Sequence, residues 1–542
     1  MGTVTTILAT ARSGRTRGMR SGVSARAPCR APPGPLLDVT AMKQARRDIA
    51  MHVMHDGLVR WQAEVSGSQE GRPVGSEQRL STVVELAQGI REGTHTAREV
   101  VAASLEAIAR LNPQLNAFSA VVAQQALEEA EQRDAQWQAG RECGPLHGVP
   151  IAIKDENDVA GLPTAYGGAA FTTAATQDSE VVRRLRAAGA VIIGKTRMPE
   201  FGIWPFTETS ANGYTRNPWN VLRSTAGSSG GTAAAVASGM VPAGIGGDGG
   251  GSIRLPSSWC GLFGLKCQRG RTSAAPNANL WRGLGVIGPL TRTVADSALI
   301  YDVISGSTAV DQWRAEPLTV TLTEALTRDP GPLRIAVAFK NPGGGPEADA
   351  ETAGAARMIA HACAELGHDV VDVVPDYPRL GTAFVAQVAA GVTDEAARAE
   401  HPELLERRTR GLVRMARPLA RRASRGEQRG VALGQAFDQA FFSHWDVLLT
   451  PTTPFAALPI GQLDGAGTLR ALRRAAPVAS YTGLWNVLGN PAAAVPAGFT
   501  SSGLPLSVQL IGPAQSEPLL VQLAAQLERV RPWADRIPPV HP

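Results

Sequence analysis

Short apolar segments of strand length alternate with helical segments along most of the chain, which is the pattern of an α/β protein. The apolar segments are rich in β-branched residues; they are VPIAI (149–153), AVIIG (190–194), RIAVAF (334–339), DVVDVV (369–374), DVLLT (446–450) and LSVQLIG (506–512). The polar run 341–350 reads as a surface connection, and strands resume after it. The pattern therefore predicts one large domain over residues 55–540, with a mixed central β-sheet covered by helices on both faces.

The clearest predicted helix follows Thr96, which forms a capping box with Glu99. One apolar stripe follows at helical spacing and consists of Val101, Leu105, Ile108 and Leu111. We expect Asn112-Pro113 to end this helix.

The segment GAVIIGKT (189–196) matches the phosphate-loop pattern G-x-x-x-x-G-K-[ST]. A phosphate loop needs small residues whose N–H groups curl around phosphates, and a helix that starts at the Lys-Thr pair. Here the spacer is apolar and β-branched, and Pro199 follows closely. The context favours a buried strand over a nucleotide site.

Residues 407–429 contain nine arginines and one acidic residue, Glu427. A basic amphipathic helix of this kind can bind a membrane surface or an anionic partner. A solvated helix face, broken at Pro418, is the simpler interpretation.

The net charge of +5 for 542 residues arises at the N-terminus. Residues 1–50 carry nine Lys or Arg and two Asp, a net charge of +7, which leaves −2 for the rest of the chain. This charge balance argues against nucleic acid as a partner. The basic segment 1–50 lacks apolar periodicity, so we expect it to be disordered or to precede the true start. No apolar run approaches the roughly 20 residues of a membrane span.

Five scattered cysteines without a C-x-x-C pair indicate a reducing, cytoplasmic compartment. The nine histidines are equally dispersed, so we expect no metal site and no cofactor.

The chemistry is expected in residues 224–266, where GSSGG (227–231) and GGDGGGS (246–252) flank an Ala-rich helix that Gly239 can terminate. The backbone N–H groups of Gly249, Gly250, Gly251 and Ser252 offer an oxyanion hole beside a nucleophilic hydroxyl. GSSGG also fits the nucleophile elbow G-x-S-x-G with Ser229 at its centre, so an α/β-hydrolase-like esterase is one alternative.

These motifs and their order resemble the amidase signature family of serine hydrolases, of the bacterial amidase type. The resemblance covers about residues 80–535 and extends from GPLHGVPIAIKD (144–155) through GAVIIGKT and RNPWN (216–220) to GLPLSVQLIG (503–512). It implies a Ser-Ser-Lys triad with Lys154 as the base, Ser228 as a bridging serine on a cis peptide, and Ser252 as the nucleophile.

The resemblance implies hydrolysis of the C–N bond of a carboxylic amide, giving an acid and ammonia or an amine through an acyl-enzyme. A lysine at a strand end can act as a base only when burial lowers its pKa, by about three units for neutrality near pH 7 to 8. Asp155, Asp248 and Arg254 are expected to brace the site rather than to react.

The substrate is expected to be a small linear amide, held near Trp204, Phe206, Trp281 and Trp485, although each of these aromatic residues also fits a core position. A second alternative is the glutamine-hydrolysing subunit of a tRNA-dependent amidotransferase, which uses the same three residues. A homodimer is left open. The chain departs from the family at Thr225-Ala226-Gly227, where the family has P-G-G, and at Lys266-Cys267-Gln268, where it has K-P-T.

Overall fold

The strands form two mixed sheets that meet edge to edge. The computed structural model describes residues 80–542, so the predicted tail of residues 1–50 and the predicted domain start at residue 55 lie outside the described residues. The first sheet has the order β1-β3-β2-β8-β10. Its strands are β1 (Phe118–Val121), β2 (Pro150–Lys154), β3 (Val191–Thr196), β8 (Ala243–Asp248) and β10 (Val286–Thr291).

The second sheet has the order β12-β11-β13-β15-β14-β9. Its strands are β9 (Gly264–Lys266), β11 (Arg334–Val337), β12 (Asp369–Asp372), β13 (Val447–Pro451), β14 (Ala492–Phe499) and β15 (Pro505–Ile511). Phe263 and Thr291 form a bridge that links the end of β9 to the end of β10. The predicted central mixed sheet is therefore present as two segments joined at this bridge.

Two short ribbons lie beside the sheets, β4 (Glu208–Thr209) with β5 (Gly213–Tyr214), and β6 (Arg216–Asn217) with β7 (Asn220–Ser224). Helices α3 to α10 are α3 (Val83–Arg91), α4 (Ala97–Leu115), α5 (Ala123–Gln138), α6 (Glu180–Ala187), α7 (Gly230–Ala237), α8 (Arg254–Cys260), α9 (Val294–Ile304) and α10 (Leu322–Ala325). The later helices are α11 (Ala350–Glu365), α12 (Ala383–Ala397), α13 (Arg407–Ala420), α14 (Ala423–Phe441), α15 (Thr468–Val478), α16 (Gly483–Leu488) and α17 (Glu517–Val530). Three 3₁₀ turns complete the described chain: η1 (Glu200–Gly202), η2 (Leu280–Gly283) and η3 (Pro402–Leu404).

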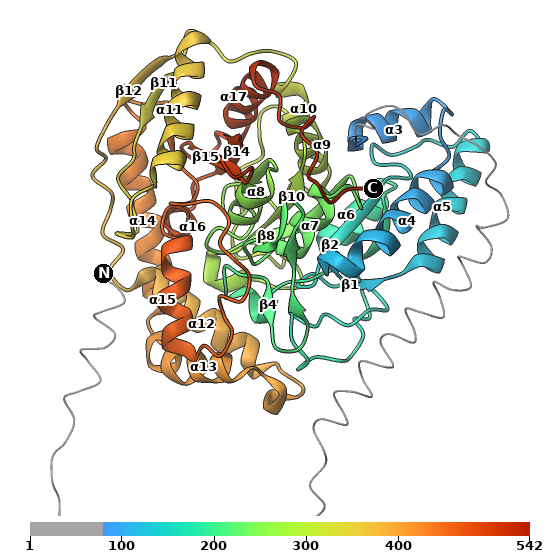
Figure 1. Ribbon diagram of the computed structural model, residues 1–542, viewed down its shortest axis with the longest axis horizontal. Helices are drawn as coiled ribbons and strands as arrows, with labels where there is room; N and C mark the ends of the chain where they lie inside the picture. The colour runs from blue at the N-terminus through green and yellow to red at the C-terminus, as the bar shows by residue number, and fades with distance from the viewer. Residues whose placement is uncertain (1–79) are drawn as a thin grey trace, which may run out of the picture. The chain divides into compact units, whose positions relative to one another are not determined.

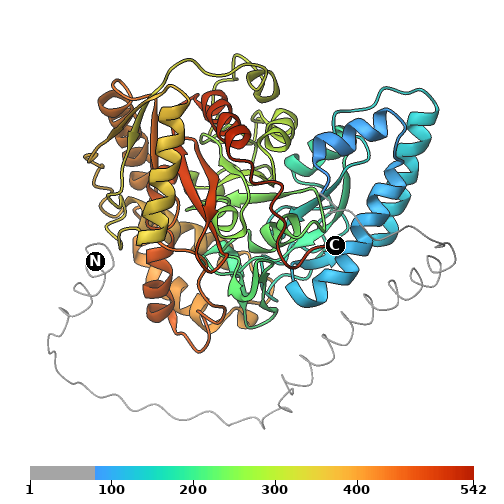
Figure 2. The ribbon, with the colours of Figure 1, turned by 45° about the horizontal axis from the view of Figure 1, so that its top comes forward.

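Helices cover both faces of the sheets, as the pattern predicts (Figures 1 and 2). One face packs against α6, α9, α11 and α17 in the largest apolar cluster, to which Ile151 and Ile153 of β2 and Ile245 of β8 belong. The other face of the first sheet packs against α7, whose residues are all buried. Successive side chains of a strand point to opposite faces, so residues of β2 alternate between the large core and α7.

The predicted strands are confirmed at all six apolar segments, and Thr96 caps α4 with both bonds of the capping box. The predicted end of this helix is wrong. Helix α4 continues through Pro113 to Leu115 and ends where Asn116 adopts a left-handed conformation with φ 53°. Proline is tolerated there because only one intrahelical hydrogen bond is lost, within the last turn.

The segment GAVIIGKT forms strand β3, not a phosphate loop. Lys195 is buried in this strand, where its Nζ lies 2.9 Å from Asp155 Oδ1 and donates to the carbonyl oxygen of Pro163 and the hydroxyl of Thr164, each at 2.9 Å. All of these contacts are internal, so Lys195 has a structural role.

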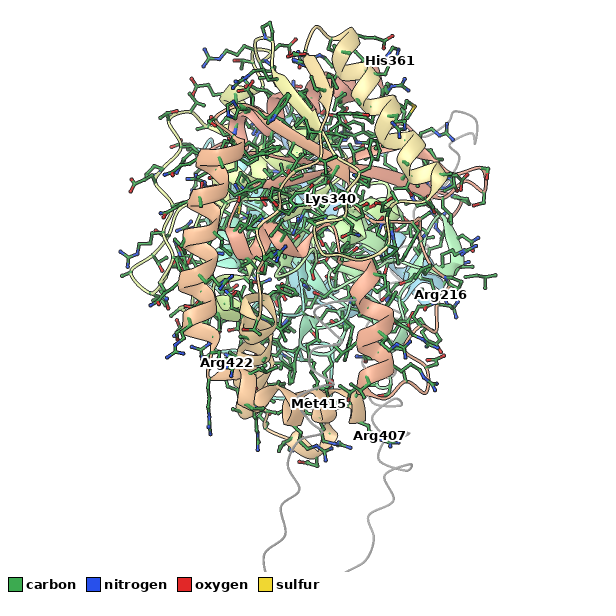
Figure 3. The ribbon with its side chains drawn as sticks, turned by 90° about the vertical axis from the view of Figure 1, so that its left-hand side faces the viewer. Arg216, Lys340, His361, Arg407, Met415 and Arg422 are labelled. Atoms are coloured by element: carbon green, nitrogen blue, oxygen red, sulfur yellow. The ribbon has the colours of Figure 1, made fainter. Side chains whose placement is uncertain are left out.

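The arginine-rich segment forms α13 and the start of α14, and its break falls just after Pro418, between Ala420 and Ala423. Arg408 pairs with buried Glu406 at 2.6 Å, whereas most of the other arginines are exposed. Figure 3 shows Arg407 and Arg422 at the outer edge of the helices. Within residues 80–542, no helix has both the length and the apolar character that crossing a bilayer requires.

The Lys195–Asp155 pair generates a stability prediction. Lys195→Met leaves a buried carboxylate without its cation, and breaking a buried pair in this way costs about 3 to 5 kcal/mol. We expect a loss of unfolding free energy in this range in urea titrations. The control is Arg98→Ala, which removes an exposed ion pair, since the side chains of Arg98 and Glu131 are 56% and 57% exposed. Loss of this pair should cost less than about 1 kcal/mol of unfolding free energy. Equal losses in the two variants would contradict the structural role of Lys195.

Candidate active site

Lys154 is the last residue of β2, and strand alternation turns its side chain toward α7. Ala152 lies on the same face of β2. The contacts of Gly244 on the neighbouring strand β8 indicate this, because a Cβ added to Gly244 would lie 2.6 Å from Thr232 of α7 and 3.5 Å from the Ala152 side chain. Ile153 and Asp155 point the other way. The backbone of β2 thus delivers a fully buried amine to the base of α7.

The Nζ of Lys154 has three oxygen partners. It donates to Ser228 Oγ at 2.8 Å and to the carbonyl oxygen of Gly247 at 3.5 Å, and it lies 3.1 Å from Glu156 Oε2. Burial lowers the pKa of Lys154, while the negative charges of Glu156 and then Asp248 oppose this shift. The sequence predicts that burial lowers the pKa of this lysine, as a neutral base requires, and the shift has this direction.

Ser228 lies between β7 and α7, and the peptide bond from Gly227 to Ser228 is cis. Gly227 is required by close packing, because a Cβ there would lie 2.7 Å from the carbonyl oxygen of Trp204 and 2.9 Å from the nitrogen of Phe206. Ala226, at the position where the family has glycine, has a φ of 60°. The departure from P-G-G therefore keeps a conformation that glycine adopts more easily.

Ser252 lies in the loop between β8 and α8 and is half-buried. Its carbonyl oxygen accepts a hydrogen bond from the N–H of Ser229 at 3.3 Å. The two glycine-serine loops are thus held side by side at the ends of the parallel strands β2 and β8.

Asp248 and Arg254 hold the shape of this loop. Both side chains are fully buried, and Arg254 donates from Nη2 to Asp248 Oδ1 at 2.9 Å and from Nε to Oδ2 at 3.0 Å. Asn486 of α16 donates to Asp248 Oδ1 at 2.9 Å. Burial alone would raise the pKa of Asp248, but Arg254, then the charge of Lys266 and the hydrogen bond of Asn486, hold it far below its usual range. Asp248 therefore stays ionised and fixes the loop.

The loop amides are not equivalent. Gly251 donates its N–H to Asp248 Oδ1 at 2.7 Å, and a Cβ on Gly251, whose φ is 128°, would lie 2.3 Å from Thr482 Oγ1. Within residues 80–542, the N–H groups of Gly249, Gly250 and Ser252 have no such internal acceptor. Three of the four predicted oxyanion donors are thus unoccupied.

Asp155 does not contact Lys154 through its side chain; it pairs with Lys195 on the opposite face. Burial raises the pKa of Asp155, and Lys195 opposes that shift. Asp155 also accepts the N–H of Ala165 at 3.2 Å. These contacts support the segment after β2.

The elbow alternative finds no support in the contacts of Ser229. Its Oγ is fully buried and bonds only to the backbone of Gly247, with both distances 3.3 Å. Histidines of the described chain lie in other contacts: His147 with Arg133, His368 with Leu333 and Gln526, and His541 with Pro538.

Three of the four aromatic residues suggested for the substrate pocket are core residues. Trp204 is 1% exposed, and Phe206 and Trp485 are 0% exposed. Trp281 is half-buried in η2 and packs against Gly391 of α12. Sequence reasoning missed Phe384 of α12, whose ring atom Cζ lies 3.3 Å from where a Cβ on Gly250 would be.

Glu156 was also missed, although it follows Lys154 by two residues. The signal was available, because two residues that far apart at the end of a strand can face the same side. Its carboxylate contacts the proposed base directly.

Known proteins share this arrangement of the chain. The family model described as Amidase matches residues 99–521. A Mycobacterium tuberculosis protein named "Putative amidase AmiA2" is 45% identical over 482 residues, covering 88% of this chain and 98% of that protein. The solved structure of a 6-aminohexanoate cyclic dimer hydrolase complexed with substrate has a TM-score of 0.78 and 32% identity, covering 85% of this chain and 99% of that one. The structure of a bacterial aryl acylamidase of the amidase signature family has a TM-score of 0.77 and 26% identity, covering 86% and 100%.

The Asp248–Arg254 pair predicts a pH-dependent loss of stability. Asp248→Asn leaves Arg254 buried without a counter-charge, and we expect a loss of about 3 kcal/mol or more at pH 7. A carboxyl whose pKa is depressed by folding stabilises the protein above its unfolded pKa of about 4 and loses this contribution as pH falls toward the folded pKa. The difference between wild type and Asp248→Asn in urea titrations should be constant from pH 8 to 5 and shrink below about pH 4. A difference that does not change down to pH 2 would contradict this reading.

Proposed function

The chain belongs to the amidase signature family and hydrolyses the C–N bond of a carboxylic amide, and from this premise we propose that Lys154, Ser228 and Ser252 are its catalytic residues. One contact supports the assignment above all. The Lys154 Nζ and the Ser228 Oγ are both buried and lie 2.8 Å apart, which is the distance of a direct proton transfer.

In the acylation step, Ser252 Oγ forms a bond to the carbonyl carbon of the amide. Its proton passes to Ser228 Oγ, whose own proton passes to neutral Lys154. The carbonyl oxygen becomes an oxyanion, for which the N–H groups of Gly249, Gly250 and Ser252 serve as donors. The Gly251 N–H is already bonded to Asp248, so this amide serves the loop instead.

The C–N bond then breaks as the leaving nitrogen takes a proton from Ser228, which regains one from the Lys154 ammonium. The product amine departs and an ester on Ser252 remains. Water attacks this acyl-enzyme by the same proton route, releasing the acid and restoring the serine hydroxyl. No metal or cofactor enters these steps.

A linear amide with an apolar acyl or aryl group is the substrate class that we propose. Phe384 and Trp281 are both half-buried. The Phe384 ring lies beside Gly250 of the serine loop, and Trp281 packs against Gly391 of α12. Apolar rings of this kind favour an apolar substrate group. One of the similar structures is named an aryl acylamidase, and another is named a 6-aminohexanoate cyclic dimer hydrolase. Action in the cytoplasm belongs to the same proposal, supported by the four free cysteines of the described chain, three of which are buried.

The first test concerns the nucleophile. Ser252→Ala should abolish hydrolysis of an aryl anilide and covalent labelling by a fluorophosphonate, because it removes the attacking oxygen. Ser229→Ala is the matched control, since it removes a neighbouring hydroxyl that contacts only backbone, and it should keep substantial activity. A label mapped to Ser229 by peptide mass spectrometry would overturn the assignment.

The same assay separates an independent amidase from an amidotransferase subunit. The purified chain should turn over anilides or benzamide without ATP or a second protein. Hydrolysis restricted to glutamine, and only with partner chains present, would instead favour the amidotransferase alternative.

The second test concerns the base. Because burial lowers the pKa of Lys154, acylation should rise with pH through an apparent pKa well below the 10.5 of an ordinary lysine. Lys154→Ala should lower amide hydrolysis by about 10² to 10⁴, the usual contribution of a general base. Amides should lose more than activated esters, because an amine leaves only when it is protonated.

Lys154→Arg provides the control for charge and size. A guanidinium does not deprotonate at accessible pH, so this variant should be as inactive as Lys154→Ala. Wild-type rates of amide hydrolysis in either variant would rule out Lys154 as the base.

A further inference from the structure

Glu156 makes the closest contact of a negative charge with the proposed base. Its Oε2 lies 3.1 Å from Lys154 Nζ, and the two side chains are 14% and 1% exposed. Together with the 2.8 Å bond to Ser228 and the 3.5 Å approach to the Gly247 carbonyl, this contact leaves the amine between oxygens from three different segments. An ammonium at this position is thus held by one full negative charge.

The position of the carboxylate is fixed by the strand beside it. A Cβ on Gly247 of β8 would lie 2.0 Å from Glu156 Oε1, so a side chain at this position would displace the carboxylate from where it lies. The same Oε1 is buried and has no hydrogen-bond partner among the described residues. A buried carboxylate oxygen without a partner is costly, and the ion pair that the other oxygen forms with Lys154 offsets this cost.

Three carboxylates on neighbouring elements have cationic partners of their own. On β3, Lys195 pairs with Asp155, and on β8 and α8 Asp248 pairs with Arg254. On α12, Glu395 pairs with Arg398. The Tyr166 side chain interacts electrostatically with both Arg398 and Glu156.

Lys154 and Glu156 are therefore each other's ionic partners. Two other cations have partners of their own: buried Lys266 of β9 interacts with Asp248, and half-buried Arg197, just after β3, interacts with Asp155. Glu156 is the one carboxylate within salt-bridge distance of Lys154 in residues 80–542.

We propose that Glu156 is a positioning residue for Lys154: its carboxylate aims the Nζ at Ser228 Oγ and stabilises the ammonium that forms when the base accepts the proton. This inference rests on the proposed role of Lys154. The physical role resembles that of a buried carboxylate that orients a catalytic imidazole and stabilises its charged form. It also sets a compromise, because the same charge that stabilises the ammonium makes the resting amine harder to deprotonate.

The experiment measures the pH dependence of fluorophosphonate inactivation, which reports attack by the serine nucleophile without a later hydrolysis step. Glu156→Gln keeps the size and an acceptor oxygen but removes the charge. The apparent pKa of the rising limb should fall by about one unit or more, because an opposite charge within about 4 Å favours the charged form of the lysine. The plateau rate should fall by about 3- to 10-fold, because a base of lower pKa accepts a proton less readily.

Three further variants distinguish positioning from general structure. Glu156→Asp keeps the charge, so its rising limb should stay near that of wild type while its plateau falls. Gly247→Ala should displace the carboxylate and move the limb in the same direction as Glu156→Gln. Glu395→Gln is the control, because this carboxylate pairs with Arg398, and it should leave the limb unmoved.

Thermal midpoints of all variants are recorded, so that the profiles are compared only between folded proteins. A wild-type limb and plateau in Glu156→Gln would overturn the inference, as would an equal shift in Glu395→Gln. Should Glu156→Gln fail to fold, the limbs of Glu156→Asp and Gly247→Ala decide: a shift in Gly247→Ala alone supports the inference, and no shift overturns it. Activity in Lys154→Ala would refute the proposed base itself, a separate result from a failure of Glu156 alone.

Discussion

The exclusion of water from one amine is the condition on which the site depends. Lys154 is fully buried at the end of β2, and an ammonium there has lost its hydration. Two kinds of partner can replace that hydration: an anion, or the neutral oxygens of hydroxyl and carbonyl groups. The structure supplies both in Glu156, Ser228 and Gly247. The same low dielectric that lowers the pKa of the amine strengthens each of these contacts.

The second half of the chain supplies the rigidity of the serine loop. Arg254 bonds to Asp248, to the carbonyl of Thr482 at 3.1 Å and to Gln509 of β15 at 2.5 Å. Asn486 of α16 bonds to the same carboxylate. A loop rich in glycine would otherwise sample many conformations, and these buried charged contacts select the one in which Ser252 meets the loop of Ser228.

Much of the fold was predictable because the apolar segments had strand length and turn residues on either side, as in VPIAI and AVIIG. The end of α4 was not, because tolerance of Pro113 depends on its position within the last turn and on a left-handed Asn116. The loop residues of the site were predictable from the glycine and serine spacing. The contact of Glu156 with Lys154 had a local signal in their spacing of two residues at a strand end. Phe384 had none, because its position depends on how α12 crosses the loop, which the local sequence does not encode. The aromatic residues at 204, 206 and 485 failed as pocket candidates for the same reason, since burial is a property of the assembled fold.

The three proposed catalytic residues lie within one stretch of about a hundred residues, from Lys154 to Ser252, that belongs to the first sheet and its α7 face. Phe384, whose ring lies beside Gly250 of the loop, comes from the second half of the chain. The proposed catalytic residues and the residue beside the loop thus come from separate parts of the chain. Substitutions at such a position can alter which amide enters while the proton route stays intact, so this architecture lets selection explore new substrates without first dismantling the reaction.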